Sequence, residues 1–205
     1  MISAQDALEK LQAGNQRYVD GDYHHYELLS QARREEVVEA QHPFAIVLGC
    51  SDSRVPAELV FDQGIGDLFV IRVAGNIVAP SQVGSIEFAA SQFGTPLVVV
   101  LGHSRCGAVD ATLSELQQPT ESRSPNLQSI VDRIRPAVQS LLSTNLKDDP
   151  EALMDEAIRA NVRASVAQLK SSSRILEDLI QAGRLTVVGA EYSLESGKVT
   201  FFEHA

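Results

Sequence analysis

Two short stretches of the sequence hold side chains that could act together in chemistry. CSDSR occupies residues 50–54, and HSRCG occupies residues 103–107. They contain both cysteines of the chain, Cys50 and Cys106, and one of its five histidines, His103. Two thiolates and an imidazole form a ligand set for zinc, of the kind that leaves a fourth position for water or substrate in catalytic sites. We therefore expect a zinc site built from these three residues.

Both stretches follow apolar runs that are typical of buried strands. The runs are FAIVLGC at 44–50 and LVVVL at 97–101, and LFVIRV at 68–73 is a third. Their hydrophobicity is continuous rather than alternating, which favours strands buried on both faces of a parallel sheet covered by helices. In open α/β sheets, functional groups gather beyond the carboxyl ends of the strands. The pattern therefore predicts that Cys50 and Cys106 lie at the same edge of the sheet.

The rest of the sequence completes an α/β pattern with a mainly parallel central sheet flanked by helices. We expect a single domain, in which an N-terminal helical arm covers residues 1–42, a zinc-site core covers 43–110, and helices with C-terminal strands cover 111–205. The arm begins with an amphipathic helix over residues 1–20, where Ser3 and Asp6 form a capping box.

Periodicity and turn residues predict the remaining elements. A short helix should follow a loop within residues 20–42. The later elements are a helix at 84–93, a helix at 127–141 that Pro136 should kink or restart, a long helix from 149 toward 183 with 171–173 as its weak point, and strands at 185–192 and 198–202.

Composition excludes several classes of partner. Lys and Arg total 17 against 27 Asp and Glu, which gives a formal net charge of −10. Nucleic-acid phosphates and anionic lipid surfaces are recognised by clustered Lys and Arg, so we expect neither partner. No apolar run approaches the length that spans a membrane, and residues 1–21 lack the features of a secretory signal. We therefore expect a cytoplasmic protein with reduced thiols.

The residues alone leave other interpretations open. A disulfide between Cys50 and Cys106, or a non-catalytic zinc or redox protein, competes with a catalytic zinc site, although a reducing cytoplasm disfavours the disulfide. No arginine follows either cysteine at the spacing of a phosphate-binding loop, which excludes a cysteine phosphatase. His24 and His25 have no cysteine near them in the sequence, and we expect them to be solvated loop residues.

The same stretches resemble the β-class carbonic anhydrases. The paired motifs CSDSR at 50–54 and HSRC at 103–106 carry the resemblance, and GDLFVIRVAGN at 66–76, GSIEFA at 84–89 and VVLGHSRCGAV at 99–109 extend it. The resemblance implies a zinc enzyme that interconverts carbon dioxide and bicarbonate, with one Zn²⁺ per subunit. It also implies an α/β fold with a mainly parallel sheet, assembled as a homodimer or as a tetramer of dimer pairs.

Carried over to this sequence, the resemblance gives roles to individual residues at the metal. Cys50, His103 and Cys106 match the zinc ligands of the family, and Asp52 and Arg54 match its catalytic pair. Asp52 also matches an aspartate that becomes the fourth zinc ligand in a closed form, when its contact with the arginine is broken.

The resemblance also assigns a substrate pocket. Gln41 matches a glutamine that lines it, and Phe69 and Phe88 match aromatic positions that wall it in. Gly107 matches a position whose backbone N–H faces the site. In the family, part of the wall comes from the other subunit. An apolar wall with a few donors suits carbon dioxide and bicarbonate.

The residue types suit the hydration of carbon dioxide. A zinc ion lowers the pKa of bound water to about 7, but two thiolates cancel its charge and weaken it as a Lewis acid. A carboxylate at Asp52 could then orient zinc-bound hydroxide by accepting its hydrogen bond, while Arg54 holds the carboxylate by a charge-assisted contact. A related linear substrate, carbon disulfide or carbonyl sulfide, is an alternative because it resembles carbon dioxide in shape.

The sequence departs from the family pattern at one position. Some bacterial members bind bicarbonate at an inhibitory site built from a tryptophan, an arginine and a tyrosine. Arg72 and Tyr192 match two of these residues, but Val47 stands where the tryptophan would be, and the chain contains no tryptophan. We therefore expect weaker inactivation by bicarbonate.

Overall fold

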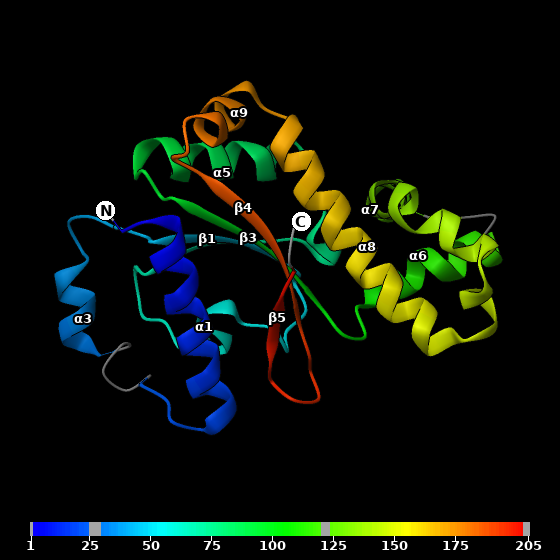
Figure 1. The fold of residues 1–205 in the computed structure, drawn as a ribbon, viewed down its shortest axis with the longest axis horizontal. Helices are drawn as coiled ribbons and strands as arrows, with labels where there is room; N and C mark the ends of the chain where they lie inside the picture. The colour runs from blue at the N-terminus through cyan, green and yellow to red at the C-terminus, as the bar shows by residue number, and fades with distance from the viewer. Residues whose placement is uncertain (1, 25–29, 120–123, 203–205) are drawn as a thin grey trace.

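The structure is a computed structural model, and it describes residues 2–24, 30–119 and 124–202. Helices and strands alternate through much of the chain (Figure 1). In chain order the elements are α1 (Ala4–Asp20), α3 (Gln31–Glu36), β1 (Ala45–Gly49), α4 (Ala57–Val60), β2 (Leu68–Arg72), the 3-10 turn η1 (Ala74–Asn76), α5 (Pro80–Gln92), β3 (Leu97–His103), α6 (Gly107–Gln117), α7 (Pro125–Val138), the 3-10 turns η2 (Gln139–Ser143) and η3 (Asn145–Asp148), α8 (Pro150–Ser171), α9 (Arg174–Gln181), β4 (Thr186–Tyr192) and β5 (Val199–Phe201).

The strands form one sheet in the order β2-β1-β3-β4-β5 (Figure 1). β1 pairs in parallel with β2 and with β3, and β3 pairs in parallel with β4. β4 and β5 are antiparallel. The predicted α/β fold with a mainly parallel sheet is confirmed. Because β1 and β3 are parallel neighbours, Cys50 after β1 and His103 at the end of β3 lie at the same edge of the sheet.

Helices cover both faces of the sheet, and successive residues of its central strands point to opposite faces. On one face, Ile46 and Leu48 of β1 pack in a hydrophobic cluster with residues of α5, α8 and α9. On the other face, Ala45 and Val47 pack with residues of α1 and α4. Both β1 and β3 are buried along their whole length, as their continuous hydrophobicity predicts.

A third hydrophobic cluster lies beyond the carboxyl ends of the strands. It joins Cys50 and Cys106 to apolar residues of α6, α7 and α8, among them Ile134 and Ile158. Figure 1 shows these three helices gathered on one side of the sheet. Cys50 is 5% exposed and Cys106 is 1% exposed, so this cluster largely shields both cysteines from water.

The prediction that residues 68–73 are buried on both faces is wrong. β2 is half-buried along most of its length, and its last residue, Arg72, is exposed. The cause is topological, since β2 forms an edge of the sheet and lies next to β1 alone among the described strands. A continuous apolar run therefore does not distinguish a central strand from an edge strand that is only half-buried.

Helix boundaries differ from the predicted ones in three places. Pro80 starts α5 earlier than predicted, because proline suits the first turn of a helix. The predicted long helix is two helices, α8 and α9, and Ser173 caps the second by accepting a hydrogen bond from the N–H of Leu176. Pro136 lies in the last turn of α7, which ends at Val138 and is followed by η2.

The N-terminal helix begins as predicted. Ser3 Oγ accepts from the N–H of Asp6 at 3.1 Å, and the Asp6 carboxylate accepts from the N–H of Ser3 at 3.2 Å, which confirms the capping box. Gly21 ends the helix with a left-handed φ of 75°. Within residues 20–42, α3 is the predicted short helix.

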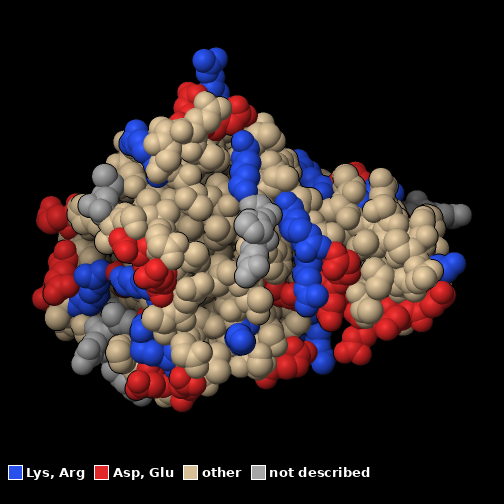
Figure 2. All heavy atoms as spheres, in the orientation of Figure 1, with Lys and Arg blue, Asp and Glu red and all other residues tan. Residues whose placement is uncertain are grey.

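Charged side chains of both signs are mixed on the surface. On the face drawn in Figure 2, Lys and Arg side chains lie among Asp and Glu side chains and form no broad basic patch in the described residues. Among those residues we also find no helix with both the length and the apolar character that crossing a membrane requires.

The buried side chain of Asn15 ties α1 to segments far along the chain. Its Nδ2 donates to the carbonyl oxygens of Val60 at 3.0 Å and of Gly197 at 2.9 Å. Its Oδ1 accepts from the N–H of Val199 at 2.7 Å. One amide therefore satisfies three backbone groups, two of which belong to the hairpin that ends in β5.

Replacing Asn15 by alanine should lower the free energy of unfolding by about 2–4 kcal/mol, because it leaves buried backbone groups without partners. Urea denaturation followed by circular dichroism measures this change. The matched control is Gln16→Ala, at the next and exposed position of α1, which should change the free energy by less than about 0.5 kcal/mol. Similar losses in the two variants would contradict the anchoring role.

Candidate metal centre

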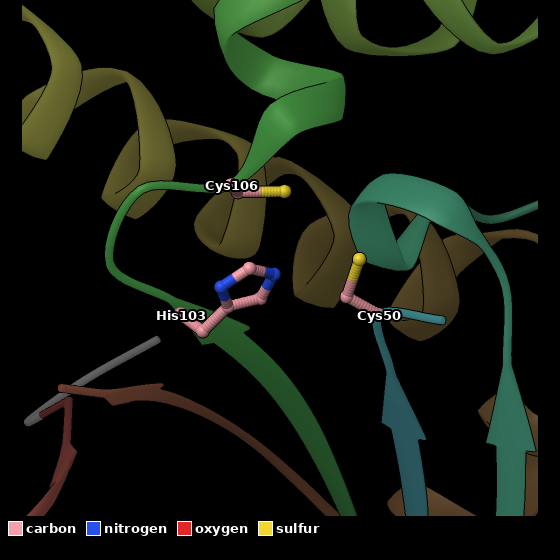
Figure 3. A group of neighbouring side chains, drawn as sticks. All are labelled: Cys50, His103 and Cys106. Atoms are coloured by element: carbon pink, nitrogen blue, oxygen red, sulfur yellow. The ribbon is translucent and has the colours of Figure 1, made fainter. Parts of the chain in front are cut away.

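Three side chains from three segments meet at the carboxyl edge of the sheet (Figure 3). Cys50 directly follows β1, His103 is the last residue of β3, and Cys106 directly precedes α6. One sulfur or nitrogen atom from each lies within 4.8 Å of the others, and all three residues are buried. The predicted meeting of the two stretches is confirmed, although β3 runs further than predicted and itself carries His103.

The ring of His103 presents an unpartnered nitrogen. Nδ1 lies 2.9 Å from the carbonyl oxygen of Ser104, to which it donates as Nδ1–H. This tautomer leaves a lone pair on Nε2, which is buried and has no hydrogen-bond partner among the described residues. Such orphaned atoms are rare in folded proteins, and a metal ion would satisfy this one. The site fits zinc, since thiolate sulfur and imidazole nitrogen are ligands that zinc prefers.

Backbone and arginine hydrogen bonds fix Cys50. The N–H of Gly75, in η1, donates to Cys50 Sγ at 3.3 Å. Arg72 donates from Nε to the carbonyl oxygen of Cys50 at 3.0 Å and from Nη2 to the carbonyl oxygen of Asp52. The last residue of β2 thus holds the turn that follows β1, and the segment after β2 contacts the sulfur.

Charge at the cluster favours a cation. A hydrogen bond from the Cys106 thiol, aided by His103 and the Gly75 N–H, lowers the pKa of Cys50 to about 4 in spite of burial. The same hydrogen bond, together with burial, raises the pKa of Cys106. Burial opposes a charge on His103, but the adjacent Cys50 thiolate outweighs it and raises the pKa of the imidazole. A divalent cation bound here would compensate the negative charge of the thiolate.

Asp52 stands beside the cluster and is held by Arg54. Arg54 donates from Nε to Oδ1 at 2.9 Å, from Nη2 to Oδ2 at 2.7 Å and from its backbone N–H to Oδ1 at 3.0 Å. These bonds hold the pKa of Asp52 well below its usual range. Oδ2 lies 3.9 Å from Nε2 of His103. The structure therefore shows the arrangement in which the contact between Asp52 and Arg54 is intact.

The loop between His103 and Cys106 rests on the hairpin that joins β4 and β5. Arg105, just before Cys106, has a left-handed φ of 56°, which is uncommon for a residue with a side chain. Glu195 of the hairpin accepts from Ser104 Oγ at 2.9 Å and pairs with Arg105 Nε at 2.7 Å. The hairpin thereby restrains the backbone that presents two of the three clustered side chains.

Comparison with known proteins agrees with this geometry. A family model described as carbonic anhydrase matches residues 45–199. The chain belongs to the carbonic anhydrase family. The carbonic anhydrase of Mycolicibacterium smegmatis is 40% identical over 200 residues, which cover 97% of this chain and 93% of that protein. Carbonic anhydrase 2 of Mycobacterium tuberculosis is 37% identical over 198 residues, which cover 97% of this chain and 92% of that protein.

Solved structures identify the class of carbonic anhydrase. The β-carbonic anhydrase CcaA is 27% identical, with a TM-score of 0.74, and the match covers 97% of this chain and 87% of that one. The β-carbonic anhydrase CafA of Aspergillus fumigatus is 26% identical, with a TM-score of 0.70, and the match covers 86% and 84% of the two chains. The predicted family, the β-class carbonic anhydrases, is confirmed.

Three of the pocket residues assigned from the β-carbonic anhydrases do not join the cysteines within one chain. Phe69 is near the start of β2, away from the carboxyl edge of the sheet. It contacts Phe88 of α5, with ring centroids 6.3 Å apart, and Phe88 is 52% exposed. Gln41 precedes β1 and is exposed. Gly107, in contrast, begins α6 directly after Cys106, so its N–H lies near the cluster.

The residues that match the bicarbonate site of some carbonic anhydrases have other partners in this member of the family. The Arg72 guanidinium binds the carbonyl oxygens described above, and the Tyr192 hydroxyl lies 3.2 Å from the hydroxyl of Tyr18. Val47 is fully buried in β1. Weaker inactivation by bicarbonate stays a prediction, and these contacts support it.

Sequence reasoning missed the groups that hold the clustered residues in place. Gly75 and Glu195 reach the site from segments 25 and 91 residues away from their partners, and no local spacing marks such contacts. The glycine in the VAGN run was the one available signal, because a glycine after a strand often permits a close backbone approach. Of the two histidines set aside, His24 is exposed, and His25 lies outside the described residues.

Replacing Arg54 by methionine should raise the pKa of Asp52 toward its ordinary value of about 3.9, because the two guanidinium hydrogen bonds that stabilise the carboxylate are lost. A carboxyl-carbon NMR titration of both proteins measures this pKa. Arg34→Met, at an exposed arginine of α3, is the matched control and should leave the Asp52 titration unchanged. An Asp52 pKa that stays depressed in Arg54→Met would contradict the assignment.

Proposed function

We propose that this protein catalyses the reversible hydration of carbon dioxide to bicarbonate and a proton, with Zn²⁺ bound by Cys50, His103 and Cys106. The observation that carries the proposal has two parts: one ring nitrogen of His103 and the two sulfurs lie within 4.8 Å of one another, and Nε2 of His103 is buried with no hydrogen-bond partner among the described residues. Membership of the carbonic anhydrase family supports the reaction. When bound, zinc supplies a nucleophile near neutral pH by lowering the pKa of a coordinated water to about 7.

Asp52 is the residue we assign to orienting the nucleophile. Its carboxylate stays ionised because Arg54 donates to both of its oxygens, and Oδ2 lies 3.9 Å from Nε2 of His103. From there it can accept a hydrogen bond and direct a lone pair toward the carbon of carbon dioxide. If the contact with Arg54 breaks, the same carboxylate could become the fourth zinc ligand and close the site, and we include this closed form in the proposal.

The structure bears on the competing interpretations of the cysteines. Cys50 and Cys106 are free thiols, which argues against a disulfide. A reducing compartment such as the cytoplasm, which we propose as the location, would keep both available to a metal. Carbon disulfide and carbonyl sulfide have the linear shape of carbon dioxide, but no feature of the described residues favours them over it.

We further propose that a second copy completes the substrate pocket, in a homodimer or a tetramer with one Zn²⁺ per subunit. Gln41, Phe69 and Phe88 lie away from the cysteines of their own chain, and Phe69 belongs to the edge strand β2. An exposed strand edge can pair with another chain, which would cover the exposed half of Phe88. Two β-carbonic anhydrases of Sordaria macrospora that share this fold are described as tetrameric.

Replacing Cys106 by serine should remove the metal, because a hydroxyl is a much poorer zinc ligand than a thiolate. Metal analysis of protein purified under reducing conditions should find about one zinc per chain in the wild type and almost none in Cys106→Ser. Cys50→Ser should behave in the same way. Ser51→Ala, at the exposed neighbour of Cys50, should keep its zinc, and zinc retained in both cysteine variants would refute the ligand set.

Asp52→Asn should keep its zinc but lose turnover by about 100-fold or more, because the amide cannot take the role of the carboxylate. Stopped-flow hydration of carbon dioxide across pH, with zinc content measured on the same samples, tests this. Asp132→Asn, at an exposed position of α7, is the matched control and should match the wild type. Equal rates for Asp52→Asn and the wild type would refute the role assigned to Asp52.

A further inference from the structure

Polar side chains on α8 bind the backbone that leads out of β2. Nδ2 of Asn161 donates to the carbonyl oxygen of Gly75 at 2.9 Å. One turn later on the same helix, Ser165 Oγ donates to the carbonyl oxygen of Asn76 at 3.3 Å. Asn161 is 2% exposed and Ser165 is 5% exposed. Two buried side chains of one helix are thus used to hold two consecutive carbonyl groups of η1.

This backbone has a turn conformation that ordinary residues seldom adopt. Gly75 and Asn76 are both left-handed, with φ of 70° and 44°. Glycine adopts this region freely, whereas a residue with a side chain, such as Asn76, is held there by its surroundings. A Cβ atom on Gly75 would lie 2.7 Å from Cδ1 of Ile134, so the segment is also pressed against α7. Packing against α7 and the hydrogen bond from Asn161 of α8 therefore act together on Gly75.

Gly75 is bonded at both of its backbone polar groups. Its carbonyl oxygen accepts from Asn161, and its N–H donates to Cys50 Sγ at 3.3 Å. Figure 3 shows the sulfur of Cys50 directed at this helical turn. We propose that Asn161 is a positioning residue, which aims the Gly75 N–H at Cys50 and so sets how much charge this thiolate gives to the bound metal. The inference rests on the proposed zinc function.

The placement of α8 makes Asn161 suited to this task. The next residue, Val162, packs over Gly102 of β3, where a Cβ atom would lie only 2.5 Å from Val162 Cγ2. The missing side chain at Gly102 lets α8 approach the strand that ends in His103. The packing of α8 on β3 therefore fixes Asn161 relative to His103. The hydrogen bond from Asn161 in turn positions Gly75, whose N–H donates to Cys50 Sγ.

The physical effect follows from charge sharing. An N–H group that donates to a thiolate withdraws negative charge from the sulfur, which then donates less charge to a metal. With two thiolates in the site, this withdrawal keeps the metal a stronger Lewis acid.

The test uses the full-length protein loaded with Co²⁺. The thiolate-to-cobalt charge-transfer band of Asn161→Leu should move to longer wavelength than that of the wild type, because a sulfur without its N–H bond releases charge more easily. Ser165→Ala is the matched control, since it removes the neighbouring bond from the same helix face, and its band should stay in place.

Two results would overturn the inference. One is an unmoved band in Asn161→Leu, and the other is an equal shift in Ser165→Ala, which would reveal general loosening of the segment. If Asn161→Leu does not fold, Asn161→Ala removes the same amide without its bulk and takes its place. A wild-type protein that shows no thiolate-to-cobalt band would refute the zinc site itself, so the failure of the proposed function is distinguishable from the failure of this inference alone.

Discussion

Two sulfur atoms and an imidazole nitrogen lie buried within 4.8 Å of one another, and any thiolate charge among them must be compensated. Burial alone would make the arrangement unfavourable, because a thiolate loses the stabilisation that water gives it. The surrounding structure compensates with groups that face the sulfur: the N–H of Gly75 and the proton of Cys106. The carboxylate of Asp52, which would add negative charge, is held by Arg54 instead. The cluster therefore depends on the charge of the neighbouring groups as well as on how they pack.

These partners come from distant parts of the fold. β1 and β3 bring Cys50 and His103 together because they are parallel neighbours, and this alone places two of the three side chains. The third, Cys106, depends on a strained loop supported by the β4–β5 hairpin. The segment after β2 depends on α8. Elements that contribute no clustered side chain thus fix the positions of those that do.

The sequence predicts the parts of this arrangement that leave a local pattern in the chain, such as an apolar run or a motif directly after it. Continuous apolar runs identify β1 and β3, and the residues that follow them identify the cluster, because strand order and direction fix where those residues lie. The edge position of β2 could not be predicted, since an edge strand that is half-covered has the same composition as a central one. The supporting contacts of Asn161 and Glu195 also have no local signal, because they depend on how whole elements pack.

The hydrogen bonds of Asn15 join residues separated by 182 and 184 positions in the chain. Contacts of such sequence separation are slow to form, because closing the long loop between them costs conformational entropy. During synthesis, Cys50, His103 and Cys106 all leave the ribosome well before Asn161 and the β4–β5 hairpin. The three clustered side chains are therefore accessible before the helix and hairpin that hold them exist. A metal captured at that stage would sit in an incomplete site, which the later elements then close around it.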